Sequence, residues 1–242
     1  ALTQRKIYNK TNGQQGAYVV ATNASWGLDN GQPANAPLWC SFYDTLGAYG
    51  ILNIAATANS NVDVDVAGDL PTACPSDYLV AVTNINKLGQ KDFSAAYGST
   101  SIDLGAFGSG VYTTKSPTGF GTFGGTSAAC PHVAGAVALL YSGACSNFMA
   151  YSLVHPDSAA LKMKSYLLNG VVPATDLSGR SVSEGYLNLN NSLNLCINDC
   201  PSSTCFSAYS IHSSHVIDTQ AQINFTFTTT VNQVQYRYRM QG

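Results

Sequence analysis

Residues 125–135 read Gly-Thr-Ser-Ala-Ala-Cys-Pro-His-Val-Ala-Gly, and an apolar run from Val133 to Leu140 overlaps their end. The small residues beside Ser127 let another backbone approach closely. The apolar run indicates a buried helix that begins near Thr126. At a helix N-terminus, unpaired backbone N–H groups and the helix dipole favour a developing negative charge. The pattern therefore predicts a serine nucleophile that carries part of its own oxyanion site.

Strand-like and helical patterns alternate along the first four fifths of the chain. Apolar runs of strand length occur at residues 16–25, 51–58, 78–84 and 102–106, and helical patterns at residues 2–12, 38–49, 126–142 and 156–169. Continuous apolar runs are typical of parallel strands that are buried on both faces. Their alternation with helices predicts an α/β fold with a mainly parallel sheet over residues 1–195.

The composition changes at Cys196. Residues 196–205 are polar and rich in cysteine, and we interpret them as a linker. Beyond them, residues 221–228 and 234–240 alternate with period two, which indicates half-buried antiparallel strands. We therefore expect residues 206–242 to form a partial antiparallel β-sandwich, which resembles the start of a fibronectin-type-III-like module.

Composition excludes several classes of partner. The 242-residue chain is only 10% charged and has a net charge of −2, so nothing favours nucleic acid or an anionic membrane. No apolar run is long enough to span a membrane. Low charge and seven cysteines favour an exported protein, secreted or at the cell surface, in which disulfides persist.

The cysteine spacings contain no Cys-x-x-Cys zinc pattern. We expect Cys130, inside the helix after Ser127, to be buried and unpaired. A Cys40–Cys74 pair is our first choice, which leaves four cysteines for two further disulfides. One option there is a small loop from Cys200 to Cys205, but connectivity does not follow from sequence.

The stretch from Gly125 to Gly135 matches throughout the serine motif of the subtilisin-like serine peptidases, Gly-Thr-Ser-x-x-x-Pro-His-Val-Ala-Gly. It is not the Gly-x-Ser-x-Gly elbow of α/β-hydrolases, because Ala129 stands at the second glycine. Other segments resemble the family in chain order: residues 23–27, 55–59, 78–82 and 103–108. The last has Phe107 where the family usually has proline. The resemblance covers about residues 1–195 and implies an incomplete copy of the family's three-layer fold.

The resemblance also assigns the oxyanion site. Ala55 to Asn59 is similar to the strand end that carries the family's oxyanion asparagine, so Asn59 would share that role with the Ser127 backbone N–H. Asn61 lies close enough in sequence to compete for the role. The alternative for Asn59 is a turn asparagine before a loop.

The same resemblance implies a substrate site. Extended substrate would pair with the backbone of Ser25, Trp26 and Gly27. A specificity pocket would form at Ala56, Thr57 and Ala58. Gly125 would admit the substrate. The loop at residues 60–76 would shape the pocket, with Asp69 near its base favouring a basic side chain. The alternative is that Asp69 is a solvated loop acid.

No cofactor is required for this chemistry, although the resemblance implies a structural calcium ion as an option, with Asp103 at one cation position. The acidic loop that begins at Asp63 is not an EF-hand, because Cys74 stands where the twelfth-position glutamate should be.

The general base is the missing part of the pattern. A serine nucleophile needs a base and an orienting acid, and the family places both before the segments matched here. His132 follows Ser127 on the same helix, His155 precedes another helix, and His212 and His215 lie in the tail. None stands at a family base position. We therefore expect the Asp and His of the triad upstream, in an N-terminal part of the catalytic domain that this chain needs.

These observations predict a secreted or cell-surface serine endopeptidase of the bacterial exported type. It would cleave polypeptides through an acyl-enzyme on Ser127, with the chain inactive by itself. One alternative is a catalytically dead module of the same family that binds peptides or mediates adhesion. Another is a serine esterase, which would need a base within residues 1–242.

Overall fold

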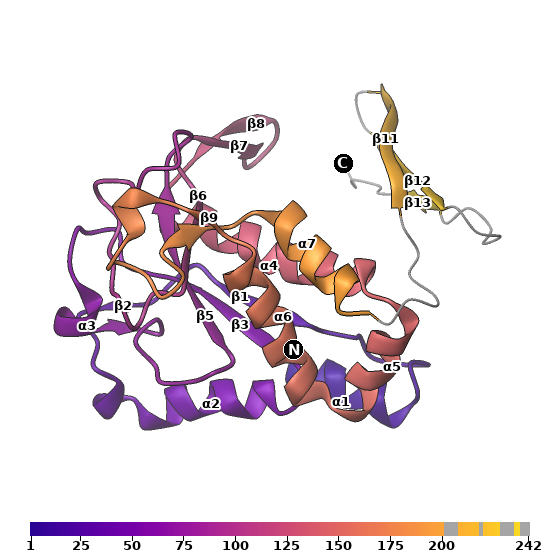
Figure 1. Ribbon diagram of the computed structural model, residues 1–242, viewed down its shortest axis with the longest axis horizontal. Coiled ribbons are helices and arrows are strands. Elements are labelled where there is room, and N and C mark those ends of the chain that lie inside the picture. Colours follow the sequence, from indigo (N-terminus) through magenta and orange to yellow (C-terminus); the bar gives the residue numbers. More distant parts are fainter. Residues whose placement is uncertain (201–207, 218–219, 228–234, 238–242) are drawn as a thin grey trace.

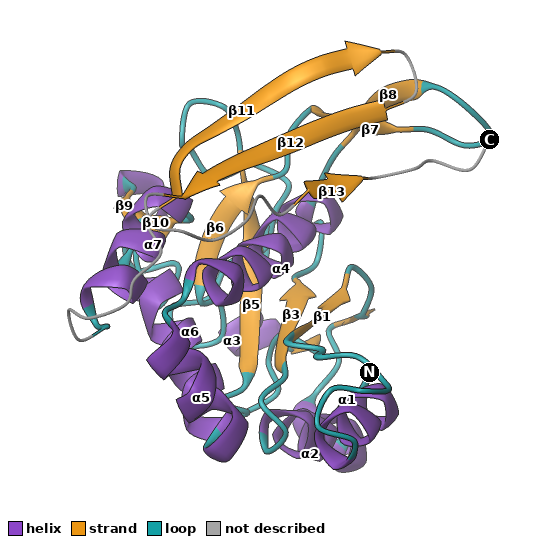
Figure 2. Ribbon diagram, turned by 90° about the vertical axis from the view of Figure 1, so that its right-hand side faces the viewer, coloured by secondary structure: helices purple, strands orange, loops and turns teal. Residues whose placement is uncertain are grey.

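The computed structural model describes residues 1–200, 208–217, 220–227 and 235–237 (Figure 1). Its main feature is a six-stranded sheet in the order β1-β3-β5-β6-β10-β9. Strands β1 (Ala21–Ala24), β3 (Leu52–Ala56), β5 (Leu79–Ile85) and β6 (Leu104–Phe107) pair in parallel, β10 (Gly185–Tyr186) pairs parallel with β6, and β9 (Val172–Pro173) pairs antiparallel with β10. Figure 2 shows β1, β3 and β6 with their arrowheads at the same end of the sheet. The predicted α/β fold with a mainly parallel sheet is confirmed.

Strands β3 and β5 are buried along their whole length, as their uninterrupted apolar runs predict. Strand β1 differs, because within the described residues it pairs only with β3 and is only partly buried. One edge of β1 therefore carries backbone groups without a ladder partner. An unpaired edge of this kind can accept a further strand.

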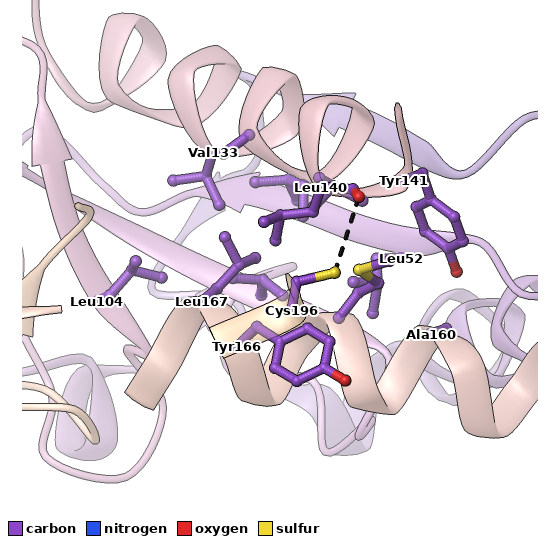
Figure 3. Packing of buried hydrophobic residues seen from close by; sticks show 14 of the residues in the cluster. Leu52, Leu104, Val133, Leu140, Tyr141, Ala160, Tyr166, Leu167 and Cys196 are labelled. Atoms are coloured by element: carbon purple, nitrogen blue, oxygen red, sulfur yellow. Dashed lines mark hydrogen bonds between the residues drawn. The ribbon is translucent and has the colours of Figure 1, made fainter. Parts of the chain in front are cut away.

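Helices cover both faces of the sheet and make three layers. On one face, α4 (Thr126–Gly143), α6 (Pro156–Asn169) and α7 (Leu189–Asn198) pack against Leu52, Ile54 and Val80 (Figure 3). On the other face, α2 (Pro37–Gly47) packs against Ile51, Ala55 and Leu79. Helix α1 (Leu2–Lys10) begins the chain, and α5 (Ser146–Val154) joins α4 to α6.

Several short elements were not predicted. They include α3 (Val64–Ala67), the two-residue pair β2 (Leu28–Asp29) and β4 (Asp69–Leu70), and the hairpin of β7 (Val111–Thr114) and β8 (Phe120–Phe123). Helices α5 and α7 and strands β9 and β10 were not predicted either. Two 3-10 turns, Pro33–Asn35 and Thr175–Leu177, complete the described loops. The β2–β4 pair matters for function because it joins the chain after residue 27 to the acidic loop.

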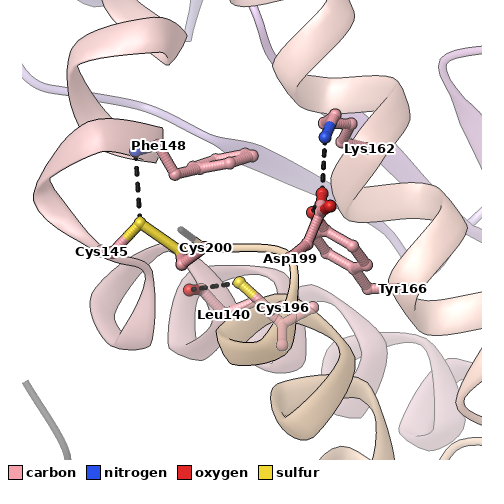
Figure 4. The surroundings of a disulfide bond; sticks show 8 residues. All are labelled: Leu140, Cys145, Phe148, Lys162, Tyr166, Cys196, Asp199 and Cys200. Carbon is pink, nitrogen blue, oxygen red and sulfur yellow. Dashed lines mark hydrogen bonds and ion pairs between the residues drawn. A yellow bond between two sulfur atoms is a disulfide. The ribbon is translucent and has the colours of Figure 1, made fainter. Parts of the chain in front are cut away.

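The compact unit extends further than residue 195, because α7 continues to Asn198 and Cys200 is bonded to Cys145 (Figure 4). This disulfide excludes the Cys200–Cys205 loop that the sequence suggested. The other bridge, Cys40–Cys74, is the pair that we expected, and Cys130 is buried without a disulfide, also as expected. Cys196 Sγ lies in the core, 3.9 Å from the Leu140 carbonyl oxygen.

After Cys200, three strands form an antiparallel sheet: β11 (Ala208–Ile217), β12 (Gln220–Phe227) and β13 (Gln235–Arg237). The two predicted strand segments correspond to β12 and β13, and β11 was not predicted. Residues 201–205 of the predicted linker lie outside the described residues. The likeness of residues 206–242 to a fibronectin-type-III-like module stays a prediction.

Candidate active site

Ser127 is the second residue of α4, and the turn before it depends on Gly125. Gly125 has a φ of 89°, and a Cβ there would lie 2.7 Å from Asn59 Oδ1. Only glycine accommodates both restrictions. The Ser127 backbone N–H, in the first turn, has no partner within the helix. It is free to donate to an anion that forms beside the hydroxyl.

Two reciprocal hydrogen bonds join Ser127 to the end of β1. Ser25 Oγ donates to the Ser127 carbonyl oxygen at 2.9 Å, and Ser127 Oγ donates to the Ser25 carbonyl oxygen at 3.3 Å. The nucleophile and the predicted substrate-binding segment are therefore in direct contact, although they are 102 residues apart in sequence.

Asn59 is exposed and lies directly after the buried segment that continues β3. Its Oδ1 accepts hydrogen bonds from the Thr126 backbone N–H at 3.0 Å and from the Thr126 hydroxyl at 3.1 Å. With Oδ1 held in this way, Nδ2 is the branch of the amide left to donate. Asn61 is engaged elsewhere, since its Oδ1 accepts from Lys91 Nζ at 3.1 Å. The geometry thus favours Asn59 as the oxyanion donor.

Thr126 was not among the predicted site residues. Its hydroxyl shares its one proton between Asn59 Oδ1 and the Thr57 carbonyl oxygen, the latter at 2.6 Å, so Thr126 ties the start of α4 to the segment that carries Asn59. Its membership of the serine motif was the one feature of the sequence that could have identified Thr126 as a site residue. Its contact with Thr57 spans 69 residues and does not follow from the motif alone.

The first predicted substrate segment is open to solvent. Trp26 is 64% exposed and stacks on Trp39, with ring centroids 5.4 Å apart. Gly27 lies against Leu70, because a Cβ on Gly27 would be 2.2 Å from the Leu70 carbonyl oxygen. Trp26 and Gly27 are therefore open to solvent beside an aromatic surface.

The second segment is buried, and Asp69 holds it. Ala56, Thr57 and Ala58 are 7%, 3% and 6% exposed. Asp69 Oδ2 accepts hydrogen bonds from Thr57 Oγ1 at 2.9 Å and from the Ala58 backbone N–H at 3.1 Å, as well as from Thr72 Oγ1. Burial raises the pKa of Asp69, and these hydrogen bonds oppose the increase. Asp69 is therefore not a solvated loop acid.

No histidine contacts Ser127 among residues 1–200, the range in which side chains are described. His132 Nδ1 lies 2.9 Å from the Ala128 carbonyl oxygen on its own helix, and the His155 ring packs on Tyr151. The side chains of His212 and His215 lie outside the described residues. The described site therefore brings together the predicted nucleophile and the predicted oxyanion donors, and neither histidine of residues 1–200 hydrogen-bonds to Ser127.

Asp103, the predicted cation position, is paired with a lysine. Its Oδ1 lies 3.1 Å from Lys164 Nζ, and its Oδ2 accepts from the Ala81 backbone N–H at 2.8 Å. Lys164 Nζ also donates to the Leu79 carbonyl oxygen. The ammonium group thus holds the oxygen donors that a hard cation would require. In the described part of the chain, no group of three or more His, Cys, Asp or Glu residues is placed to hold a metal ion.

Comparison with known families explains this arrangement. The family model described as "Subtilase family" matches residues 1–186. The chain belongs to the subtilase family. Members are serine peptidases, so the contacts of Ser127 and Asn59 lie within a serine-peptidase fold.

The relatives of this subtilase include proteases from several organisms. It is 33% identical over 98 residues to Subtilisin-like protease 2 of Plasmodium falciparum, covering 40% of this chain and 7% of that protein. It is 29% identical over 153 residues to Subtilisin of Bacillus pumilus, covering 59% and 54%. An Extracellular protease of Xanthomonas campestris is 33% identical over 141 residues, covering 49% and 24%. The chain thus spans little more than half, or far less, of these relatives.

Solved structures show the same fold. The protease domain of PatA matches with a TM-score of 0.61 at 22% identity, covering 82% of this chain and 66% of that one. The prenylagaramide maturation protease PagA matches with a TM-score of 0.57 at 22% identity, covering 79% and 65%. The disulfides of this subtilase fit an extracellular protein, as does its likeness to an extracellular protease. In the described residues no single helix is long and apolar enough to cross a membrane, and only the bent pair α4 and α5 together has that length and composition.

Proposed function

We propose that this chain carries the nucleophile and oxyanion half of a secreted or cell-surface serine endopeptidase, exported in the manner of the bacterial enzymes. The observation that supports it most directly is the anchoring of Asn59 Oδ1 on Thr126. That anchoring leaves Asn59 Nδ2 and the Ser127 N–H to donate to one substrate oxygen, beside the Ser127 hydroxyl.

In the proposed reaction, Ser127 Oγ forms a bond to the carbonyl carbon of the scissile peptide and loses its proton to a general base. Asn59 Nδ2 and the Ser127 N–H stabilise the resulting oxyanion. The carbon–nitrogen bond then breaks, and the base returns the proton to the leaving amine. Water attacks the acyl-enzyme by the reverse sequence and releases the carboxylate and Ser127. Substrate backbone pairs with Ser25–Gly27 by strand addition.

We place the base and its acid in an N-terminal part of the same catalytic domain. Two unpartnered surfaces support this. Helix α4 is apolar nearly all round, yet one flank exposes Pro131, His132, Gly135, Ala138 and Leu139, the last of them 46% exposed. Helices that are apolar all round are normally covered.

The second surface is the unpaired edge of β1, which leads directly to Ser25. A cavity of about 330 Å³ also lies beside the exposed flank of α4, between Val111 and Phe123 of the hairpin and Pro131 of the helix. A strand added to β1 and a helix packed on α4 would cover both surfaces and bring a histidine to Ser127.

A second candidate function is peptide binding without catalysis. It is favoured by one observation: Ser127 Oγ donates to the Ser25 carbonyl oxygen instead of to a base. On this alternative, the upstream histidine or aspartate is replaced, and the Ser25–Gly27 segment still binds extended peptides.

Labelling of the complete protein with a fluorophosphonate separates the two. We expect labelling at Ser127, its loss in Ser127→Ala, and unchanged labelling in Ser142→Ala, an exposed serine in the last turn of α4. Absence of labelling in a folded, complete protein that still binds peptides would favour the second candidate. Ester turnover by residues 1–242 alone would contradict the dependence on an upstream base.

A further inference from the structure

The two segments that would hold a substrate meet at Asp69. On one side, Thr57 and the Ala58 backbone donate hydrogen bonds to its carboxylate. On the other, the neighbouring residue Leu70 contacts Gly27 and pairs with Leu28 in the β2–β4 ladder. Asp69 therefore lies where the chain that follows Ser25 approaches the segment that ends at Asn59.

Asp69 is buried without a cation. It is 2% exposed, and all three of its hydrogen-bond donors are neutral and converge on Oδ2. Among residues 1–200, no hydrogen bond reaches Oδ1 and no lysine or arginine nitrogen lies within 4.0 Å. A buried carboxylate in this condition is costly unless a positive group pairs with it.

Asp103 provides a comparison within the same chain. It is 8% exposed, the other buried aspartate of the described region, and it has Lys164 Nζ at 3.1 Å. This chain thus supplies a cation to one buried carboxylate and none to the other. Asp29, which pairs with Asp69 across the β2–β4 ladder, adds a second negative charge near the Asp69 carboxylate, which has no cation partner among residues 1–200.

We propose that Asp69 is the specificity-determining carboxylate of this peptidase, selecting polypeptides with lysine or arginine on the acyl side of the scissile bond. This rests on the proposed function. Asn59 directly follows Ala58, whose N–H binds Asp69, so adjacent residues connect the oxyanion site to the carboxylate. The carbonyl of the acyl-side residue meets Asn59 Nδ2, and its ammonium or guanidinium group pairs with Asp69 Oδ1.

The competing interpretation is that Asp69 only fastens Thr57, Ala58 and Thr72 together. Asp69→Asn separates the two, because an amide oxygen still accepts from these donors while the charge is removed. The measurement is kcat/KM of the complete protein on peptides that differ only in the acyl-side residue: Lys, Arg, Gln and Phe. Asp65→Asn, an exposed acid of the same loop, is the matched control.

We expect the wild-type protein to cleave Lys and Arg peptides at least tenfold better than the Gln peptide. In Asp69→Asn, kcat/KM should fall about 100-fold for Lys and Arg and change less than about threefold for Phe. Asp65→Asn should match wild type on all four. An equal loss on every peptide, or a wild-type preference for Phe, would overturn the proposal.

A binding measurement keeps the proposal independent of turnover. Benzamidinium should raise the Tm of the complete protein, and Asp69→Asn should abolish this shift. If benzamidinium binds through Asp69 but nothing is cleaved or labelled, the peptidase function fails and the cation site stands. If peptides are cleaved without charge preference and benzamidinium does not bind, the cation site fails and the function stands. If neither occurs, both are wrong.

Discussion

Asn59 Oδ1 accepts two hydrogen bonds from Thr126, one from its backbone N–H and one from its hydroxyl. Both donors belong to the residue immediately before Ser127. The orientation of the amide is therefore set by the same turn that presents the nucleophile. Any change that moves Ser127 also moves the Thr126 donors that orient Asn59, so the two parts of the oxyanion site move together.

Asn59→Ala should lower kcat about 10² to 10³-fold with little change in KM, because the lost donor acts mainly in the transition state. Asn59→Asp should lose as much, since it keeps the acceptor for Thr126 but has no N–H. Steady-state kinetics on the complete protein check both. Asn61→Ala should retain activity, and a larger loss there than at Asn59 would assign the oxyanion role to Asn61.

Thr126→Val should reduce both activity and stability. The substitution removes a fully buried hydroxyl and leaves the Thr57 carbonyl oxygen without this donor, at a cost of about 1–3 kcal/mol. We also expect kcat to fall about tenfold, because Asn59 loses one of its two anchors. Thr126→Ser, which keeps the hydroxyl, should restore most of both in urea unfolding and kinetic assays. Equal losses in Val and Ser would instead indicate that the methyl group is what matters.

Lys164→Met should destabilise the protein by about 3–5 kcal/mol, because it leaves the Asp103 carboxylate buried and uncompensated. The double variant Lys164→Met with Asp103→Asn should recover much of the loss. Calcium addition and chelation should leave the wild-type Tm unchanged, because the Lys164 ammonium group already neutralises the Asp103 carboxylate. A chelator-induced fall in the wild-type Tm would show that calcium stabilises the protein after all.

Asp69 should give a pH-dependent stability difference. Burial raises its folded-state pKa, so the folded protein holds this proton more tightly than the unfolded chain. The carboxyl group therefore costs no stability below the unfolded-state pKa, and the cost grows as pH rises through the folded-state pKa. Asp69→Asn does not titrate, so its Tm advantage over wild type should increase from about pH 4 to about pH 7. A constant difference would show that the carboxyl titrates normally.

Several of the larger elements could be predicted because their patterns are local. The buried run at residues 51–58 led to β3, and the motif after Gly125 led to α4, which ends within a residue of its expected end. Helices α5 and α7 and strand β11 were missed despite their length. The short elements that were missed lack such a pattern. The β2–β4 pair has two residues in each strand, and the hairpin strand Val111–Thr114 exposes Tyr112, 73% accessible, so neither shows a buried periodicity.

The candidate site likewise contains a part that could be predicted from sequence and a part that could not. Ser127 and Asn59 could be predicted from motifs, but their surroundings depend on contacts between distant parts of the chain. Thr126 reaches Asn59 across 67 residues, and Ser25 reaches Ser127 across 102. Asp69 looked like a loop acid because Gly68 and Pro71 beside it are typical of turns. It is buried in the fold, where it lies in the β2–β4 pair and its carboxylate accepts hydrogen bonds from Thr57 and Ala58.

The Cys145–Cys200 disulfide also gives the molecule a mechanical property. A force applied through the chain beyond Cys200 reaches a covalent bond before it reaches α7, and passes directly to Cys145, two residues after α4 ends at Gly143. Tension on the C-terminal segment would thus bear on the helix that carries Ser127 without first unwinding α7. A peptidase attached to a surface or to a larger partner through that segment would keep its nucleophile in place under load for as long as the disulfide is oxidised.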